Sequence, residues 1–533
     1  MPALDPPLSS TRRAIERLPR HLRRYVVPQN YAAYTPRDQA LWRHVMRRLS
    51  SRLATIAHPV YLEGLAATGI ELERIPSLDQ MNDRLGRFGW SAVAVRGFIP
   101  PAVFTELQSL RVLAIAEDIR DHRHVDYTPA PDIIHESAGH APILAVPRYA
   151  EYLERCGEVG FRAIASREDE AVFDAIRNLS IVKEDPSRTP EDGARAERRL
   201  AEAQASRRYV SENTRASRLY WWTAEYGLVG RLDAPKLYGA GLLSSLGEAE
   251  HCLTPVVRKL PLGLECADTD YDITRMQPQL FVARDFDHLF EALDAFRETL
   301  AWRRGGDFGL GEALRAGTVN HLSLAGGLQV SGVVAALAPS QRPPGPDLSP
   351  SAARLRGPVQ LARGGRALAA PFRGDALVLF GEGHLPERGA FSLTLPSGLR
   401  VEGVAEGGHE VRALRATLGD QTVAAADRML VVLAPSLPSV AGGPADPASW
   451  DEHFGEQNPF GDGEGEAEAR AKKAASLPRG AADLYERVRV LGRSGACDER
   501  TLDELRRKAA AYPDEWLLRE EIDRLKAHLD PAA

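Results

Sequence analysis

The chain contains little cysteine and no long hydrophobic run. Its 533 residues include four cysteines, at positions 156, 252, 266 and 497, with no C-x-x-C pair. This spacing excludes a disulfide framework or a zinc ribbon and favours a reducing compartment. The longest apolar runs, such as Val333–Pro339, fall far short of the about 18 residues that a membrane-spanning helix needs. The first residues lack the apolar stretch of a signal peptide, so we expect a cytoplasmic protein with no membrane partner.

A strong excess of charge of one sign is also missing. Lys and Arg total 67 and Asp and Glu total 73, which gives a net charge of −6. This balance offers no general basic surface, so we do not expect a nucleic-acid partner. Hydrophobic residues make up 44% and charged residues 26%, as in an ordinary globular protein. At roughly 150 residues per domain, the length allows about three domains.

Residues 34–309 carry apolar residues at helical spacing. The stretches 38–56, 104–119 and 285–302 each place apolar residues three or four positions apart, which predicts three amphipathic helices. Between residues 182 and 217 the sequence is rich in Glu, Arg and Ala and has almost no apolar stripe. We interpret that stretch as a solvated helix on a surface insertion. The region as a whole is predicted to be mainly α.

In residues 310–435 the apolar period changes to two. The segments 321–334 and 391–405 alternate apolar and polar residues around a Gly-containing turn, as β-hairpins do. The pattern L-x-L-x-x-G-L-x-V-x-G-V begins at Leu322 and again at Leu393. Reuse of a hairpin pattern and a true duplication both explain this repeat. We expect a small β domain of unknown role.

Three further segments flank these two regions. Residues 1–33 are an N-terminal extension. Residues 436–476 have the Pro-, Gly- and acid-rich composition of a flexible linker, and residues 477–533 return to a helical pattern. The expected order is therefore a mainly α domain, a β-rich domain, an acidic linker and a helical C-terminal module.

The segment DYTPAPDIIHESAGHAP (126–142) places His135, Glu136 and His140 within six residues. Zinc-dependent hydrolases have H-E-x-x-H, with the histidines at i and i+4 on one helix face. Here the histidines are at i and i+5, about 140° apart on an ideal α-helix. They can bind one metal only if the helix ends or deforms between them, and Gly139 offers a place for that. Two unconnected histidines at a helix end are the alternative.

The apolar and aromatic run YWWTAEYGLVG (220–230) contains one carboxylate, Glu225. A carboxylate in such surroundings is costly unless it is paired or binds a cation. Two histidines and one carboxylate form the facial triad of non-haem Fe(II) oxygenases. A salt bridge from Glu225 to an arginine remains the alternative.

The motif PDIIHESAGHAP resembles the signature of the pterin-dependent aromatic amino acid hydroxylases, the family of phenylalanine, tyrosine and tryptophan hydroxylases. Residues 221–228 resemble the family segment with the third iron ligand. YGAGLLSSLGE (238–248) and residues 260–282 resemble two further segments in the same order. The resemblance spans about residues 34–302. It implies that residues 34–309 form a mainly helical catalytic domain with a basket-like iron site.

The resemblance implies iron(II) and a tetrahydropterin (tetrahydrobiopterin or a related pterin) as cofactors. The activity that follows is hydroxylation of the ring of a free aromatic amino acid with O2. We expect phenylalanine to be converted to tyrosine, the step that opens phenylalanine catabolism. The alternatives are a tryptophan or tyrosine hydroxylase, a zinc-dependent hydrolase, and a catalytically inactive scaffold or partner-binding protein. Oligomeric state is left open.

Matched residue by residue, the family pattern makes His135, His140 and Glu225 the iron ligands. Glu136 then lies beside the pterin and bound water, and Tyr271 lies near the metal; these two are the expected catalytic residues. The resemblance also implies that Phe104 stacks on the pterin. Arg120 is expected to bind the substrate carboxylate through a bidentate fork, which lysine lacks. The expected residues of the amino-acid pocket are Thr128, Trp221, Gly241 and Ser244.

The sequence departs from the family pattern at three positions. Ser137 and Ala138 stand where the family usually has bulky apolar residues between the histidines. Ala114 stands where a histidine is often found near the pterin. These departures put the fit of the pterin and the size of the pocket in doubt, but not the metal.

Overall fold

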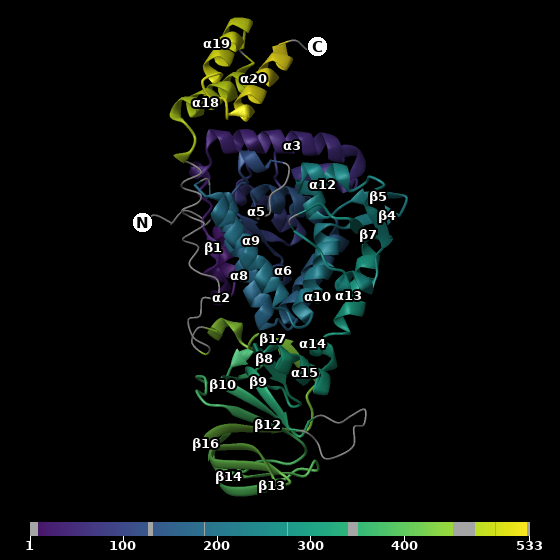
Figure 1. Ribbon diagram of the computed structural model, residues 1–533, viewed down its shortest axis with the longest axis vertical. Helices are drawn as coiled ribbons and strands as arrows, with labels where there is room; N and C mark the ends of the chain where they lie inside the picture. The colour runs from purple at the N-terminus through teal and green to yellow at the C-terminus, as the bar shows by residue number, and fades with distance from the viewer. Residues whose placement is uncertain are drawn as a thin grey trace, which may run out of the picture.

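The computed structural model describes residues 9–125, 132–185, 187–273, 275–338, 350–450, 453, 475–495 and 497–529. A helical region, a β region and a helical tail are arranged along the long axis of the molecule (Figure 1). The helical region occupies the middle, with the β region at one end and the tail at the other. No helix among the described residues is long and apolar enough to cross a membrane.

The helical region is built from short and medium helices, in which η marks a 3-10 or π-helix. Its helices are α1 (Ser10–Arg17), α2 (Arg20–Arg23), η1 (Tyr31–Ala33), α3 (Pro36–Ile56), α4 (Val60–Ala67), α5 (Leu78–Leu85), η2 (Gly86–Phe88), α6 (Pro101–Ser109), η3 (His122–His124), η4 (Ile134–His140), η5 (Ala141–Ala145), α7 (Pro147–Arg162), α8 (Arg167–Glu184), α9 (Pro190–Ala205), α10 (Glu212–Tyr220), η6 (Trp221–Glu225), α11 (Ala240–Ser244), α12 (Leu246–His251), η7 (Leu264–Asp268) and α13 (Phe286–Arg297). Helices α14 (Ala301–Arg304) and α15 (Gly306–Ala316) follow and pack against the β region.

Two small sheets make the mainly α description only partly correct. One sheet has the order β1-β2-β3 and the other β5-β4-β7-β6. Their strands are β1 (Val26–Val27), β2 (Ser91–Val95), β3 (Val112–Ala116), β4 (Leu228–Arg231), β5 (Ala234–Leu237), β6 (Arg258–Pro261) and β7 (Gln279–Ala283).

The helix predicted over residues 104–119 is wrong in its second half. Helix α6 ends at Ser109, the chain turns at Arg111 with a φ of 58°, and β3 follows. All five residues of β3 are buried. A strand buried on both faces is apolar at every position, so its leucine and isoleucine also satisfy helical spacing. The helix predicted over residues 38–56 is confirmed as α3.

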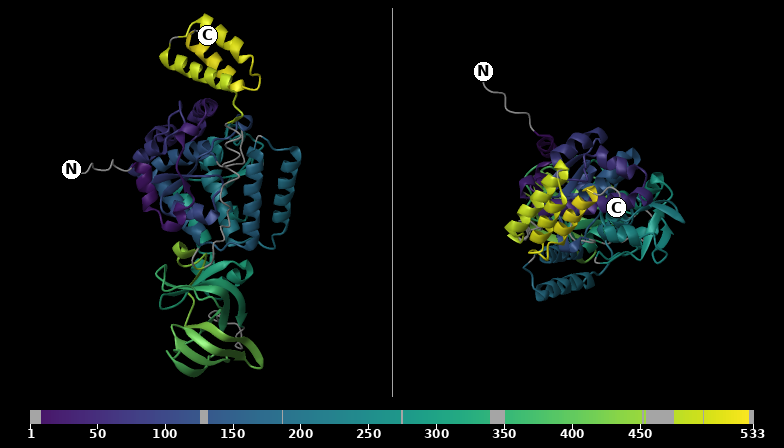
Figure 2. Two further views of the ribbon diagram at one scale, coloured as in Figure 1. Left: turned by 90° about the vertical axis from the view of Figure 1, so that its left-hand side faces the viewer. Right: turned by 90° about the horizontal axis from the view of Figure 1, so that it is seen from above.

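Residues 167–205 form a helical hairpin of α8 and α9 instead of the single solvated helix expected between 182 and 217. Each helix begins with a capping box, Ser166 with Asp169 and Thr189 with Asp192. The two helices pack through a small hydrophobic cluster of their own, formed by Val172, Ala175, Leu179, Ala196 and Leu200. Figure 2 shows the hairpin along one side of the helical region.

The β region is one large, strongly curved sheet. Its strands are β8 (Val319–Ser323), β9 (Leu328–Ala338), β10 (Ala352–Arg363), β11 (Arg366–Ala367), β12 (Ala376–Phe380), β13 (Gly389–Thr394), β14 (Leu399–Gly407), β15 (Glu410–Leu418), β16 (Gln421–Ala434) and β17 (Ser439–Gly442). They pair in the order β13-β14-β15-β16-β12-β10-β9-β8-β17, with β11 beside β10.

Both predicted hairpins are confirmed, with equivalent registers. Leu322 of β8 pairs with Val330 of β9, and Leu393 of β13 pairs with Val401 of β14. The repeated sequence pattern therefore forms the same local structure twice.

Strand β17 corrects the predicted linker. It pairs with β8, so residues 439–442 belong to the sheet. Gly305 packs against Leu437 and Pro438, the residues just before β17. Its φ is 54°, and a Cβ there would be 2.4 Å from the Leu437 carbonyl oxygen. Of the predicted linker, residues 451–452 and 454–474 lie outside the described residues.

The helical tail is docked on α3, contrary to the expected loose attachment. Its helices are α18 (Arg479–Ser494), α19 (Glu499–Ala509) and α20 (Trp516–Leu529). Arg37 and Arg43 of α3 form buried ion pairs with Glu515 (2.9 Å) and Glu521 (2.5 Å). Apolar residues of the tail belong to the same hydrophobic cluster as α3.

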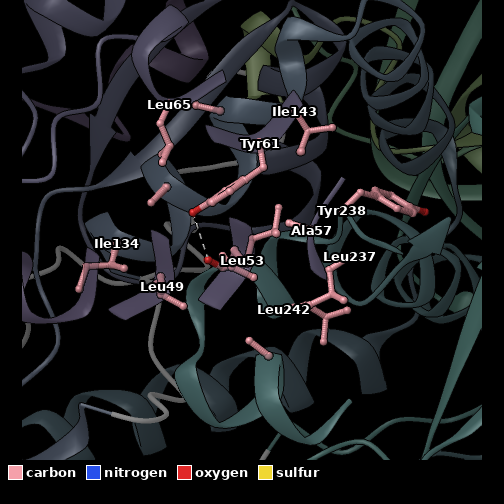
Figure 3. Packing of buried hydrophobic residues seen from close by; sticks show 14 of the residues in the cluster. Leu49, Leu53, Ala57, Tyr61, Leu65, Ile134, Ile143, Leu237, Tyr238 and Leu242 are labelled. Atoms are coloured by element: carbon pink, nitrogen blue, oxygen red, sulfur yellow. Dashed lines mark hydrogen bonds between the residues drawn. The ribbon is translucent and has the colours of Figure 1, made fainter. Parts of the chain in front are cut away.

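The hydrophobic cluster that includes α3 also packs against η4, the segment that carries the two histidines. Tyr61 of α4 donates a hydrogen bond to the Leu243 carbonyl oxygen at 3.5 Å, which joins α4 to α11. Figure 3 shows the side chains around this contact: Leu49, Leu53, Ala57, Leu65, Ile134, Ile143, Leu237, Tyr238 and Leu242.

Candidate metal centre and its cavity

Helix η4 resolves the spacing of the two histidines. It is a π-helix over Ile134–His140, in which hydrogen bonds run from residue i to i+5. Residues five apart therefore lie on the same side, and the rings of His135 and His140 are 5.1 Å apart between centroids. The expected deformation is thus a property of the whole segment and not a break at Gly139.

Gly139 has a different role, a close approach between elements. A Cβ at this position would lie 2.7 Å from the Ala240 carbonyl oxygen at the start of α11. Gly241 likewise brings α11 against η6, because a Cβ there would lie 2.7 Å from the Tyr226 ring. Both glycines let α11 pack against the two segments that carry the candidate ligands.

Helix η6, a second π-helix, presents Glu225 to both histidines. The Glu225 carboxylate oxygens lie 3.2 Å from His135 Nε2 and 3.1 Å from His140 Nε2. The His140 side chain is 1% exposed and that of Glu225 11%. These three groups thus converge from two π-helices at one buried point.

The donor set fits a divalent cation. His140 Nδ1 is buried and has no hydrogen-bond partner among the described residues, and the buried Nε2 approaches Glu225 at 3.1 Å without hydrogen-bond geometry. Ligand atoms of His135, Glu136 and His140 also lie within 4.8 Å of one another. Unpartnered buried nitrogens are rare and call for a specific cause, and imidazole and carboxylate are common ligands of iron.

The two carboxyl groups at this point differ in charge. Burial raises the pKa of Glu136 to about 8, which favours its neutral form. Burial also opposes ionisation of Glu225, but His140 and His135 together lower its pKa below the ordinary value. Glu225 is therefore the anionic carboxylate of the cluster.

Ser244 fixes the orientation of His135. Its hydroxyl donates to the Ala240 carbonyl oxygen at 2.7 Å, so its oxygen accepts from His135 Nδ1 at 2.9 Å. This arrangement assigns the proton to Nδ1 and leaves Nε2 to face Glu225. Ser244, predicted as a pocket residue, lines the cavity and also positions a candidate ligand.

Asp132 holds Arg120 in place. Its carboxylate accepts from Arg120 Nε at 2.8 Å and Nη2 at 3.1 Å, and both side chains are 2% exposed. Asp132 also accepts from the His135 backbone N–H at 2.9 Å. Burial opposes ionisation of Asp132, but Arg120 lowers its pKa below the usual value. One buried carboxylate thus links Arg120 to the start of η4.

The cluster opens into a cavity of about 1030 Å³. Phe104 of α6 lines it and makes an edge-to-face contact with Tyr220 at 5.7 Å. The Trp221 ring stacks on Tyr271 at 4.3 Å and on Tyr226 at 4.5 Å, forming an aromatic wall. This volume is at the upper end of the range for small-molecule sites.

The structure brings all but two of the expected site residues to the lining of this cavity. The lining includes Phe104, Arg120, His135, Glu136, Trp221, Glu225, Gly241, Ser244 and Tyr271. His140 lies behind them, against Glu225. Thr128 lies outside the described residues.

Sequence reasoning missed Asp132, Gln108 and Tyr220. Asp132 was detectable, because an acidic residue three positions before the histidine segment is typical of a helix start. The contact between Gln108 and the Tyr220 hydroxyl, at 2.5 Å, joins positions 112 apart and leaves no local pattern.

Comparison with known proteins gives a consistent result. The family model described as biopterin-dependent aromatic amino acid hydroxylase matches residues 5–175 and 200–304. The phenylalanine-4-hydroxylase of Mesorhizobium japonicum is 29% identical over 272 residues, which are 50% of this chain and 82% of the relative. That of Chromobacterium violaceum is 29% identical over 271 residues, 50% of this chain and 76% of the relative.

A solved structure of the Chromobacterium violaceum phenylalanine hydroxylase with bound Fe(III) aligns with a TM-score of 0.42 and 26% identity. The alignment covers 56% of this chain and 94% of that chain. A structure of the same enzyme with iron(III) and 7,8-dihydrobiopterin aligns with a TM-score of 0.41.

Proposed function

Because the chain belongs to the family of biopterin-dependent aromatic amino acid hydroxylases, we propose that it is an iron(II)- and tetrahydropterin-dependent monooxygenase that converts phenylalanine to tyrosine with O2. The observation that carries this proposal is the convergence of His135, His140 and Glu225 at one buried point beside a cavity. These three residues would bind the iron. Their arrangement on one side leaves positions for other ligands, as in a facial triad.

The rest of the cavity is suited to two organic partners. When bound, iron and the reduced pterin activate O2 and supply the electrons for ring hydroxylation. Phe104 offers an aromatic face to the pterin. Arg120, oriented by Asp132, offers a fixed cation to the substrate carboxylate. Positioning of both partners by rigid side chains is the main contribution of the protein to such a reaction.

Three residues define where protons and the aromatic ring are held. Glu136, kept neutral by burial, can hold a proton beside the metal position. Trp221 and Tyr271 form a stacked wall that excludes water from one side of the cavity. Tyr271 keeps its proton at neutral pH, since burial raises its pKa to about 12.

Phenylalanine is the proposed substrate because the relatives given above are named phenylalanine-4-hydroxylases. Tryptophan and tyrosine remain the alternatives within the family. The intact set of His135, His140, Glu225 and Arg120 argues against an inactive scaffold. We assign the activity to residues 34–309, since all proposed site residues lie there, and we place the protein in the cytoplasm, where its four free cysteines would stay reduced.

The test is a turnover assay of the full-length protein with Fe(II), tetrahydrobiopterin and each of phenylalanine, tyrosine and tryptophan. Products are identified by mass and retention time. We expect tyrosine from phenylalanine, with the highest kcat/KM of the three. Absence of any pterin-dependent product would overturn the proposal, and a higher kcat/KM for tryptophan or tyrosine would overturn the substrate.

A further inference from the structure

The helical hairpin α8–α9 forms part of the wall of the catalytic cavity. Val172, Phe173 and Ile176 of α8 and Leu200 of α9 line it, together with Arg207 just after the hairpin. The family model leaves residues 176–199 unmatched, so most of this hairpin is additional to the family pattern. Figure 2 shows the hairpin beside the helical region that holds the metal centre. Of the lining residues named here, Ile176 lies in the unmatched part, whereas Arg207 lies in the matched part that follows the hairpin.

Three nitrogen donors in the cavity lining, from Arg207, Arg218 of α10 and Trp221 of η6, lack acceptors. The Nε atoms of Arg207 and Arg218 and the indole Nε1 of Trp221 are buried and have no hydrogen-bond partner among the described residues. All three residues line the cavity. The Arg218 side chain is 9% exposed and that of Arg207 28%. Buried donors without acceptors are rare, and three in one cavity lining indicate an acceptor group supplied by a ligand.

All three side chains that carry these donors interact with Tyr271. Trp221 stacks on its ring, and the charges of Arg207 and Arg218 act on Tyr271, where they limit the rise in its pKa that burial causes. They thus lie on the aromatic wall of the cavity, whereas Arg120 is held by Asp132.

The charges around the donors set the kind of acceptor. Arg218 Nη2 is 3.2 Å from Asp270, and its Nη1 is 3.5 Å from the Asp268 carbonyl oxygen. Arg207 is 3.9 Å from Asp169, whose oxygens already accept from Ser211 and Thr214. Two acidic side chains close to the arginines repel a dianion more than a monoanion. A planar carboxylate matches the guanidinium donors and carries one charge.

We propose that Arg207, Arg218 and Trp221 form a second carboxylate subsite, beside the one at Arg120. This inference rests on the proposed function, because it concerns what the substrate cavity accepts. The carboxylate comes from one of two sources: an aromatic substrate with an acidic group beyond its α-carboxylate, or a small free carboxylate that binds beside the substrate. Both sources use the same donors.

The experiment compares two dipeptides that differ in one charge, Asp-Phe and Asn-Phe. Each keeps the phenylalanine carboxylate, and only Asp-Phe carries a second one. Their binding to the full-length protein is measured by isothermal titration calorimetry. We expect Asp-Phe to bind about tenfold more tightly than Asn-Phe, the gain typical of a charged hydrogen bond. Arg207→Gln should bring the ratio close to one.

A second arm tests the free carboxylate. Phenylalanine binding is titrated with propionate or with its neutral match, propionamide. If the source is a free carboxylate, propionate changes the dissociation constant of phenylalanine for the wild type and not for Arg207→Gln, while propionamide has no effect. The matched control is Arg195→Gln, on the same hairpin, whose side chain is 69% exposed and pairs with Asp192.

Each outcome is decisive. A charge preference or a propionate effect that Arg207→Gln removes and Arg195→Gln keeps supports the subsite and identifies its source. Absence of both effects in the wild type, or their persistence in Arg207→Gln, overturns it and assigns the donors to water. Because binding is measured without turnover, a subsite that holds in a protein unable to hydroxylate phenylalanine would separate failure of the proposed function from failure of this inference.

Discussion

The helical region and the β region differ in what they bury. In the β region, between Val319 and Gly442, the buried polar side chains of the described residues are Asn320, Ser331, Ser351 and Gln360, and none is charged. The helical region buries ionisable groups in its interior, among them the charged Arg120, Asp132 and Glu225 and the neutral Glu136. Buried charge costs free energy unless it is paired or binds a cation.

This difference indicates that the helical region tolerates the free-energy cost of buried ionisable groups because its site needs them. The buried charges of Arg120, Asp132 and Glu225 have partners that fix their positions. Irregular helical geometry is found there as well, because both histidines and Glu225 lie on π-helices. The β region has two apolar clusters, one within its strands and one shared with α14 and α15. Substitutions in the first region should therefore affect activity, and those in the second should affect stability alone.

The largest effect is expected for the three candidate iron ligands. His135→Ala, His140→Ala and Glu225→Ala should each lose most of the bound iron and reduce hydroxylation more than about 100-fold. Mutation of a residue that only hydrogen-bonds a metal ligand already lowers metal affinity or activity by about 10–100-fold. Iron content is measured by plasma mass spectrometry, and activity by tyrosine formation. Glu291→Ala is the control, because that side chain is 61% exposed. Full iron content in Glu225→Ala would contradict the ligand assignment.

A smaller effect on turnover is expected for Arg120→Lys. A lysine keeps the charge but cannot contact Asp132 through two nitrogens and present a further N–H to the substrate. We expect KM for phenylalanine to rise about tenfold, with a smaller change in kcat, in line with the loss of one charged hydrogen bond. Arg123→Lys, at a side chain that is 50% exposed, is the control. An unchanged KM would remove Arg120 from the substrate site.

The same contrast explains how much the sequence could predict. The two hairpins were predictable with their turns, because alternation and glycine placement are local. The segment of β3 was mistaken for helix, because a fully buried strand has no alternation. For η4, the spacing of His135 and His140 required a deformed helix, but the π-helix itself has no recognised local pattern.

Contacts between segments far apart in the sequence could not be predicted, because no local sequence pattern encodes them. The Arg37–Glu515 pair joins residues 478 positions apart, so the docking of the tail could not be inferred from either segment. The hairpin α8–α9 was expected on the surface, and its reach into the cavity depends on how it packs. The cluster of site residues was predictable because the motif resemblance orders them, although Asp132 and the second role of Ser244 were not.

The tail should affect stability far more than activity. Glu515→Gln removes the carboxylate that pairs with buried Arg37, and breaking such a buried pair costs about 3–5 kcal/mol. We expect α18–α20 to undock, with faster amide hydrogen exchange in the tail. Hydroxylation should stay within about twofold, because no described tail residue lines the cavity. Glu504→Gln, at a side chain that is 37% exposed, is the control and should change little.

Truncation gives an independent test of the same point. A cut near Gly442 falls at the end of β17, a strand that pairs with β8, and would disturb this edge of the sheet. Truncation after His453, which is buried and accepts a hydrogen bond from Gln360, preserves the sheet. This shorter chain should bind iron and hydroxylate phenylalanine. Loss of turnover in a folded truncated protein would make the tail part of the catalytic machinery.

The smallest effect on activity is expected in the β region, at Leu322→Ala. Leu322 is fully buried in β8, and loss of its side chain should cost about 2–5 kcal/mol of unfolding free energy. Thermal unfolding should detect this loss, whereas hydroxylation and iron content should stay within about twofold of wild type. Leu368→Ala is the control, since that residue is 55% exposed.

The effect of Leu322→Ala on activity depends on how the β region is connected to the metal centre. Ile164 belongs to the same cluster as Leu322, and its N–H donates to Glu212, which also accepts from the Ala301 N–H. Glu212 begins α10, which leads directly into η6 and Glu225. This buried junction is therefore one route by which a loosened β region would reach the metal centre. If Leu322→Ala lowers iron content as much as it lowers the unfolding temperature, the junction transmits the disturbance and the two regions act as one unit.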